Sequence, residues 1–253
     1  MPTAGVEFAK VSYKPAGGHV VLRDISLVLE EGTCTALLGR SGSGKTTLLR
    51  MVNALVQPTS GVVSVHGERV SGIHDEATLI ALRRGIGYVI QETGLFPHMT
   101  IERNAALALE LAGSSRQESS RRARELLELA GLEFEAVRER YPWQLSGGQR
   151  QRVGLARALA LDPRVLLMDE PFGALDPLTR AEMQTMLKRL LDQIKKTVLI
   201  VTHDLEEALY LADRIVFLAD GEIVADMPSS DVVSSGNSHV RSYVEAVRRT
   251  EGR

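Results

Sequence analysis

The chain has little cysteine and lacks long hydrophobic runs. Of its 253 residues only Cys34 is a cysteine, so no disulfide can form within the chain. Cys34 lies in an expected strand (33–38), which favours a small buried side chain over a reactive thiol. No apolar run approaches the ~18 residues of a membrane-spanning helix, and residues 1–10 lack the pattern of a secretory signal. We therefore expect a protein of a reducing compartment that does not itself span a bilayer.

An excess of charge of one sign is also missing. The chain has 30 Lys and Arg against 32 Asp and Glu, a net charge of −2. This balance argues against sequence-independent binding of nucleic acid. The arginines of residues 116–124 have acidic neighbours and are typical of a solvated helix face. The length allows one large α/β domain, or a domain with a subdomain.

The most informative segment is a glycine-rich loop between an expected strand (33–38) and an expected helix (46–55). It matches the phosphate-binding pattern G-x-x-x-x-G-K-[ST]. Its backbone N–H groups can converge on a polyphosphate, assisted by the N-terminus of the following helix. The loop comprises Gly39, Arg40, Ser41, Gly42, Ser43, Gly44, Lys45, Thr46 and Thr47. Lys45 would contact the β- and γ-phosphates, and Thr46 would bind Mg²⁺. The alternative is an ordinary glycine-rich turn, but the number of matching positions predicts a nucleoside triphosphate site.

A second candidate stretch is the apolar strand 165–168, which ends in two carboxylates, Asp169 and Glu170. In proteins with a phosphate-binding loop, such a strand delivers an acid to Mg²⁺, and Asp169 suits that role. Glu170 can then orient or deprotonate the attacking water. A strand that simply ends in surface charges is the alternative.

The third stretch is Leu-Ser-Gly-Gly-Gln at residues 145–149. Ser146 and Gln149 have the spacing of a capping box that begins a helix. Such a cap does not require Gly147 and Gly148, which weaken a first turn. The two glycines indicate close approach of a ligand to a helix N-terminus that carries a serine hydroxyl.

Together these motifs resemble the nucleotide-binding subunit of ATP-binding-cassette (ABC) transporters, from about residue 6 to residue 245. The resemblance implies two subunits paired head to tail, with each ATP held between the phosphate-binding loop of one subunit and the signature of the other. Ser146, Gly147, Gly148 and Gln149 would then contact the γ-phosphate of the partner's ATP.

The resemblance also implies roles for four isolated residues. Gln91 matches the glutamine that senses Mg²⁺ and the membrane subunits, and would be both catalytic and a metal contact. Asp176 closes a loop (173–176) that crosses the dimer interface, with glycine where the family often has serine. His203 matches the histidine that contacts the γ-phosphate; it follows an apolar strand at the edge where α/β sites form. Tyr13 is the candidate for adenine stacking, or else an ordinary strand residue.

The expected fold is α/β: a RecA-like P-loop NTPase core with an antiparallel β subdomain and a helical insert, the ABC ATPase cassette. We expect one cassette over residues 1–253. Residues 1–90 and 141–253 would form the core with its β subdomain, and residues 91–140 the helical subdomain.

The resemblance predicts an ATP-hydrolysing subunit, with ATP and Mg²⁺ as cofactors, that energises an importer. Residues 51–61 and 88–100 look like the osmoprotectant branch, which imports glycine betaine, carnitine or choline. The implied partners are a second copy, permease subunits and, indirectly, a solute-binding protein, but no nucleic acid. The implied location is the cytoplasmic face of the membrane. The apolar loop 95–99 would receive the permease, or else pack within its own subdomain.

Three alternatives stay open. The chain could serve another ABC system, for amino acid or other solute import, lipid trafficking or export. It could be a soluble ABC ATPase, although it has neither a long coiled-coil insert nor a second cassette. It could use ATP only as a dimerisation switch. The presence of Glu170 and His203, which are candidates for hydrolysis, argues against this alternative.

Overall fold

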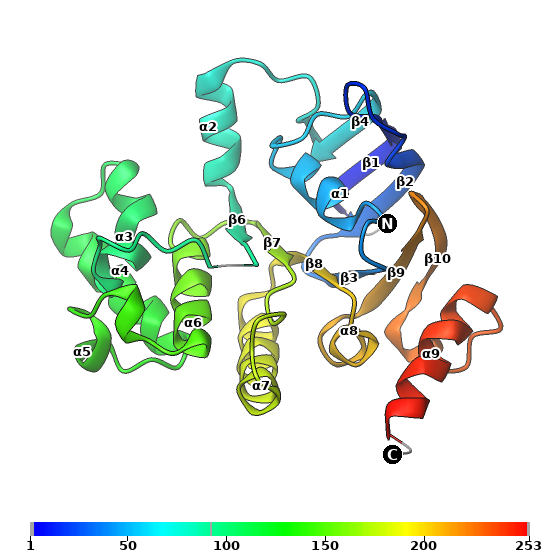
Figure 1. Ribbon diagram of the computed structural model, residues 1–253. Coiled ribbons are helices and arrows are strands. Elements are labelled where there is room, and N and C mark those ends of the chain that lie inside the picture. Colours follow the sequence, from blue (N-terminus) through cyan, green and yellow to red (C-terminus); the bar gives the residue numbers. More distant parts are fainter. Residues whose placement is uncertain (1–2, 92, 252–253) are drawn as a thin grey trace. The chain divides into compact units, whose positions relative to one another are not determined.

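The computed structural model describes residues 3–91 and 93–251 of the chain (Figure 1). The chain forms two compact units: residues 1–82 together with 196–253, and residues 83–195. Each unit is described by itself below. Helix α2 (Glu76–Arg84) belongs partly to each.

The first unit contains an antiparallel sheet in the order β2-β1-β4-β5, of which Figure 1 labels β1, β2 and β4. Its strands are β1 (Ala4–Tyr13), β2 (Leu22–Glu30), β4 (Ser60–Val65) and β5 (Glu68–Arg69). Val6, Phe8 and Val11 of β1 are at most 1% exposed, while neighbouring positions of the strand are open to solvent. This partial alternation places one face of β1 against the core.

Parallel strands form the other sheet of this unit. Strand β3 (Cys34–Leu38) pairs in parallel with both β8 (Thr197–Thr202) and β9 (Arg214–Ala219). Strand β10 (Glu222–Pro228) continues antiparallel to β9. Every residue of β3 and β8 is buried, which is typical of parallel strands covered on both faces. Helices α1 (Lys45–Val52), α8 (Leu205–Leu211) and α9 (Ser238–Glu251) and the 3₁₀ turn Ser229–Asp231 complete the unit.

The second unit combines a parallel strand pair with helices. Strands β6 (Ile86–Val89) and β7 (Val165–Asp169) pair in parallel. The helices are α3 (Ile101–Leu111), α4 (Arg116–Leu129), α5 (Phe134–Val137), α6 (Gly147–Ala158) and α7 (Pro177–Ile194), with a 3₁₀ turn at Pro142–Gln144. Thr100 and Ser115 accept hydrogen bonds from backbone N–H groups at the starts of α3 and α4, so short polar side chains set where both helices begin.

The predicted mixture of parallel and antiparallel strands with a helical segment is confirmed. The sequence patterns did not predict β5 or α5, which are too short for a periodic signal. Helix α1 ends at Val52 rather than Leu55, because Asn53 leaves the helical conformation and Ala54 has φ +55°. The boundaries at residues 91 and 140 stay a prediction. Within the described residues, none of the helices has both the length and the apolar character needed to cross a membrane.

Candidate nucleotide-binding site

The loop 39–44 joins β3 to α1 and holds its lysine in place. Lys45 is only 5% exposed, and its Nζ donates to the carbonyl oxygens of Gly39 (2.8 Å) and Arg40 (3.0 Å). The N–H of Ser43 donates to the Arg40 carbonyl at 3.2 Å, which closes the loop into a turn. The ammonium group therefore lies within the curl of the loop, where it can meet a phosphate.

At two positions of the loop the geometry of the backbone requires glycine. Gly44 precedes α1 with φ +103°, a conformation that a residue with a side chain rarely adopts. At Gly39 an added Cβ would lie 2.3 Å from the carbonyl oxygen of Leu218, so β9 leaves no room for a side chain. The backbone path of the loop thus depends on both positions.

The loop also offers polar groups that suit an anion. No side chain caps α1 in the described part of the chain, and the N-terminus of a helix is a favourable place for an anion. The buried Ser43 Oγ has no hydrogen-bond partner among the described residues. A buried hydroxyl without a partner calls for an explanation, and a bound phosphate oxygen would provide one.

Two further candidates lie in the first unit. His203 follows β8 and is exposed. The turn that carries it is held by Asp204, whose N–H donates to Thr202 Oγ1 (3.0 Å) and whose carboxylate accepts from the N–H of Glu207 (3.2 Å). Tyr13 ends β1 opposite Leu22, and its role in adenine stacking stays a prediction.

In the second unit, β7 ends at the two predicted carboxylates. Asp169 is 5% exposed and accepts a hydrogen bond from the Tyr88 hydroxyl at 3.3 Å. Glu170 has φ +45°, which is uncommon for a residue other than glycine and concentrates at functional sites. The hydrogen bond from the Gly173 N–H to the Glu170 carbonyl (3.3 Å) closes the turn that follows.

Gln91 and Glu170 converge on Gly173. A Cβ built on Gly173 would lie 3.7 Å from Gln91 Nε2 and 3.8 Å from Glu170 Oε2. The structure therefore brings two of the three predicted catalytic residues, an amide and a carboxylate, close to a residue without a side chain. The loop ends at Asp176, which caps α7; hydrogen bonds from the Thr179 hydroxyl and N–H hold the pKa of its carboxyl below the ordinary value.

The stretch 145–149 begins α6 with a capping box. Ser146 Oγ accepts from the Gln149 N–H (3.2 Å), and Gln149 Oε1 accepts from the Ser146 N–H (3.0 Å). Gly148 has a packing reason that the sequence did not reveal, because an added Cβ would lie 2.5 Å from Thr179 Cγ2. The interpretation of both glycines as points of ligand approach is therefore incomplete, since Gly148 is buried and allows α6 to contact α7.

Sequence reasoning missed three polar residues that hold the segment after Gln91. Gln151 Nε2 donates to the Gln91 carbonyl (3.2 Å). Arg157 donates to the Thr93 and Gly94 carbonyls, both at 2.7 Å, and burial lowers the pKa of its guanidinium. Asn104, fully buried, bonds the backbone of residues 96–100. The only feature of the sequence that could have revealed these three residues is that they are polar residues within helical stretches.

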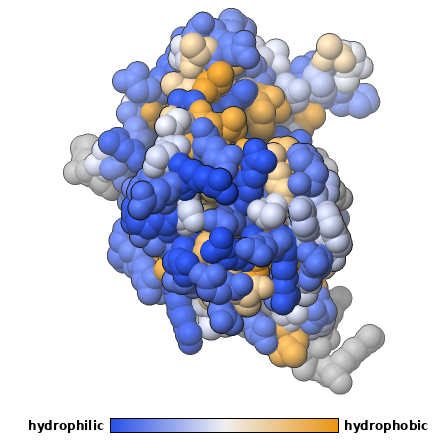
Figure 2. Space-filling model, turned by 90° about the vertical axis from the view of Figure 1, so that its left-hand side faces the viewer, coloured by the Kyte–Doolittle hydropathy of each residue, from blue (hydrophilic) through white to orange (hydrophobic). Residues whose placement is uncertain are grey.

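A cavity of about 370 Å³ lies beside this segment. Its lining is mainly apolar and includes Ile86, Phe96, Leu107, Leu111 and Leu161. Phe96 is 41% exposed and Leu111 71% exposed. The face of the molecule in Figure 2 is mostly hydrophilic, with hydrophobic side chains gathered in its upper part.

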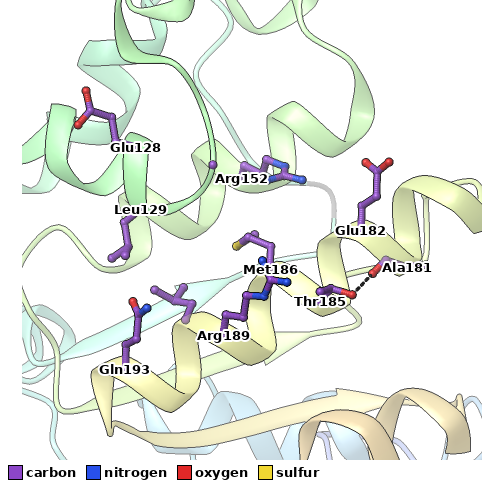
Figure 3. Close-up of a pocket in the computed structure, with 11 residues that line it drawn as sticks. Glu128, Leu129, Arg152, Ala181, Glu182, Thr185, Met186, Arg189 and Gln193 are labelled. Atoms are coloured by element: carbon purple, nitrogen blue, oxygen red, sulfur yellow. Dashed lines mark hydrogen bonds between the residues drawn. The ribbon is translucent and has the colours of Figure 1, made fainter.

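A second cavity, of about 720 Å³, lies between the end of α4, α6 and α7 (Figure 3). Both signs of charge line it, from Glu128 and Glu182 to Arg152 and Arg189. None of the predicted site residues contributes to its lining, so it is separate from the features above.

Comparison with known proteins gives the family. The family model described as ABC transporter matches residues 22–173, more than half of the chain. The chain belongs to the ABC transporter family. The matched region includes the phosphate-binding loop, the signature at 145–149 and both carboxylates of β7.

Two curated relatives are similar over almost the whole chain. The carnitine transport ATP-binding protein OpuCA of Listeria monocytogenes is 42% identical over 98% of this chain and 62% of its own length. The glycine betaine uptake system ATP-binding protein YehX of Escherichia coli is 45% identical over 94% of this chain and 76% of its own length. The chain thus spans less than two thirds of the length of OpuCA.

Solved structures of cassettes share the fold. A dimeric ATP-binding cassette in a post-hydrolysis state, bound to ADP and Pi, is 36% identical with a TM-score of 0.79 and covers 88% of this chain and 98% of its own. A protein of Clostridium perfringens described as part of an ABC transporter complex is 23% identical with a TM-score of 0.85, over 99% of this chain and 100% of its own. The predicted ABC ATPase cassette is thereby confirmed as the fold.

Proposed function

We propose that this cassette is the ATP-hydrolysing subunit of an importer for osmoprotectants, the quaternary amines of the glycine betaine, carnitine and choline type. Relatives at 42–45% identity are named for transport of these solutes. The observation that carries the proposal is the phosphate-binding loop with its buried lysine, in one chain with the signature motif.

ATP fits the first unit because the loop supplies what a triphosphate requires. Lys45 provides a positive charge held within the loop, the uncapped start of α1 provides N–H groups, and Ser43 Oγ provides a buried hydroxyl that has no partner among the described residues. A helix N-terminus with such groups is a general anion site. Tyr13 is proposed to stack on adenine.

Mg²⁺ would neutralise the phosphates during transfer, and the hydroxyl of Thr46 and the carboxylate of Asp169 are the oxygen ligands that suit it. Tyr88 orients Asp169 by its hydrogen bond at 3.3 Å. Gln91 would contact both the metal and the reacting water.

Hydrolysis requires a base for the attacking water, and we assign this role to Glu170. Its carboxylate lies beside Gly173, together with the Gln91 amide, and its backbone adopts an uncommon conformation. His203, exposed at the end of β8, would hydrogen-bond the γ-phosphate. Asp176 would lie at the dimer interface.

The partners follow from the same family. A second copy would pair head to tail, so that Ser146, Gly147, Gly148 and Gln149 face the other chain's ATP. Permease subunits would hold the cassette at the cytoplasmic face of the membrane, and a solute-binding protein would act through them. The dimeric state of a cassette 36% identical to this chain supports the pairing.

Replacing Glu170 with glutamine tests the chemical proposal. Glu170→Gln keeps the shape of the side chain and removes the basic oxygen, so kcat should fall about 10²–10⁴-fold. ATP binding, measured by equilibrium titration, should persist because Lys45 and the loop amides are unchanged. Wild-type turnover in the folded variant would show that Glu170 is not the base.

The substrate class needs a separate measurement. We expect glycine betaine, carnitine or choline to stimulate ATP hydrolysis by the cassette assembled with its permease and solute-binding protein in proteoliposomes. Stimulation by an amino acid alone would favour the alternative of another ABC import system.

A further inference from the structure

Trp143 is the only tryptophan of the chain and lies two residues before the signature motif. Its side chain is 65% exposed, which is high for so large an apolar group. Exposed tryptophans are enriched among the residues that contribute most to binding. The position and the exposure of Trp143 together indicate that its side chain contacts a ligand or a partner.

The indole is held in a defined orientation. It stacks on the ring of Tyr141, with centroids 4.7 Å apart and an interplanar angle of 11°. The 3₁₀ turn that carries it is closed by two hydrogen bonds: Gln144 N–H to the Tyr141 carbonyl (2.9 Å), and Tyr141 N–H to Gln144 Oε1 (2.7 Å). Buried Leu145 anchors the end of the turn. One face of the indole is therefore covered, and the rest is presented to solvent without much loss of side-chain freedom on binding.

The place of the indole limits what can reach it. Ser146 is three positions after Trp143 in the sequence, so even a fully extended chain would put their Cα atoms at most about 10–11 Å apart. Under the proposed function, Ser146 faces the γ-phosphate of ATP held by a second copy. The rest of that nucleotide then passes within reach of an exposed aromatic ring. Planar bases stack readily on such rings, whatever their sequence or substituents.

We propose that Trp143 forms part of the binding site for the nucleoside of the second copy's ATP, so that the stacked pair Tyr141–Trp143 covers the base or ribose when the dimer closes. This inference rests on the proposed head-to-tail dimer. It adds an aromatic contact in trans to the phosphate contacts of the signature. The single indole then also reports closure, because stacking on a base quenches its fluorescence and shields it from solvent.

The test uses Trp143 fluorescence in the Glu170→Gln variant with Mg²⁺ and ATP, while light scattering follows dimer formation. We expect ATP to produce the dimer, lower the indole emission and protect it from iodide. The matched control is the double variant Glu170→Gln with Ser146→Arg, which should bind ATP as a monomer and keep its indole bright and accessible.

The outcomes separate the two proposals. If no dimer forms, the proposed function fails. If the dimer forms but Trp143 stays bright and open to iodide, the nucleoside contact is wrong, and the exposed ring serves another surface, such as a permease. A signal that persists in the monomeric control would also overturn the contact.

Substitution gives an independent readout. In the Glu170→Gln background, Trp143→Ala should raise the ATP concentration needed for dimerisation about 5- to 10-fold, at the lower end of measured base-stacking contributions. Trp143→Phe should restore much of this. Binding of ATP to the monomeric control should not change. Val233→Ala, at an exposed apolar position elsewhere (53% exposed), is the control for surface hydrophobicity. An unchanged dimerisation curve in folded Trp143→Ala would contradict the proposal.

Discussion

In the second unit, one candidate catalytic residue has a backbone conformation that its residue type disfavours. Glu170 adopts φ +45°, which has an energetic cost for a residue with a side chain and persists only where the surroundings impose it. The turn closed by the Gly173 N–H imposes it here. The result is a carboxylate directed to the same place as the Gln91 amide.

Gly148 has a packing role in addition to the binding role that we propose for the signature. It lies in the signature, where ligand approach was the predicted reason for glycine. In the structure it also allows Thr179 of α7 to lie against α6, since an added Cβ would be 2.5 Å from Thr179 Cγ2.

We therefore expect Gly148→Ala to destabilise the protein by about 1–3 kcal/mol, the usual cost of overpacking. Urea unfolding at equilibrium measures the change. Thr179→Ser removes only the conflicting methyl group, so it should restore most of the loss when combined with Gly148→Ala. Absence of rescue would show that the contact between the two residues is not the cause.

At the scale of elements, the segment from Thr93 to Thr100 is held by helices on both sides. Arg157 of α6 binds the carbonyls at its start. Asn104 of α3 binds Phe96, Met99 and Thr100 at its end. The segment has no regular secondary structure, yet its backbone is fixed while Phe96 remains 41% exposed.

Asn104→Ala should test how much this anchoring contributes. The substitution removes the side-chain partner of the Phe96 N–H and of the Met99 carbonyl, while the Phe96 and Thr100 carbonyls keep backbone donors. Unsatisfied buried groups cost about 1–3 kcal/mol. We expect a loss of that size in the unfolding free energy, measured by urea denaturation. Glu110→Ala, at an exposed site of the same helix, is the control and should change stability little.

Phe96→Asp should separate assembly from catalysis. We propose that the cavity beside Phe96 receives a short cytoplasmic helix of the permease, because an exposed apolar patch marks an interaction site. The variant should keep the ATPase rate of the isolated cassette but lose co-purification with the permease and solute-stimulated ATPase. Normal assembly and transport in the variant would show that the loop 95–99 does not bind the permease.

At the scale of the whole molecule, the proposed reaction needs two copies. The phosphate-binding loop and the signature lie in different units of the chain. In the head-to-tail arrangement that we propose, the second copy would supply the signature. The chain would then show cooperative ATP hydrolysis only as a dimer.

Mixing two inactive variants tests this arrangement. Lys45→Ala should weaken ATP binding, whereas Ser146→Arg should block hydrolysis and leave monomer binding intact. A mixture should regain part of the ATPase activity, because a mixed dimer contains one site with both a normal loop and a normal signature. Equal loss of monomer ATP binding in the two folded variants would contradict the trans arrangement.

The sequence by itself determined the family and most of the elements. The phosphate-binding loop and the Leu-Ser-Gly-Gly-Gln stretch depend on residue types at short, fixed spacing, so they can be identified without a structure. The two buried strands are equally local. Residues 165–168 of β7 are a continuous apolar run, and in β3 only Thr35 interrupts the apolar residues.

The tertiary structure alone decided which distant residues meet. No short-range pattern connects Tyr88 with Asp169, Gln151 with Gln91, or Gly148 with Thr179. These contacts arise because strands and helices far apart in the sequence pack together, and packing depends on the shape of whole side chains. The exposure of Trp143 belongs to the same class. The sequence shows that a tryptophan lies beside the signature, but only the tertiary structure shows that its side chain is exposed.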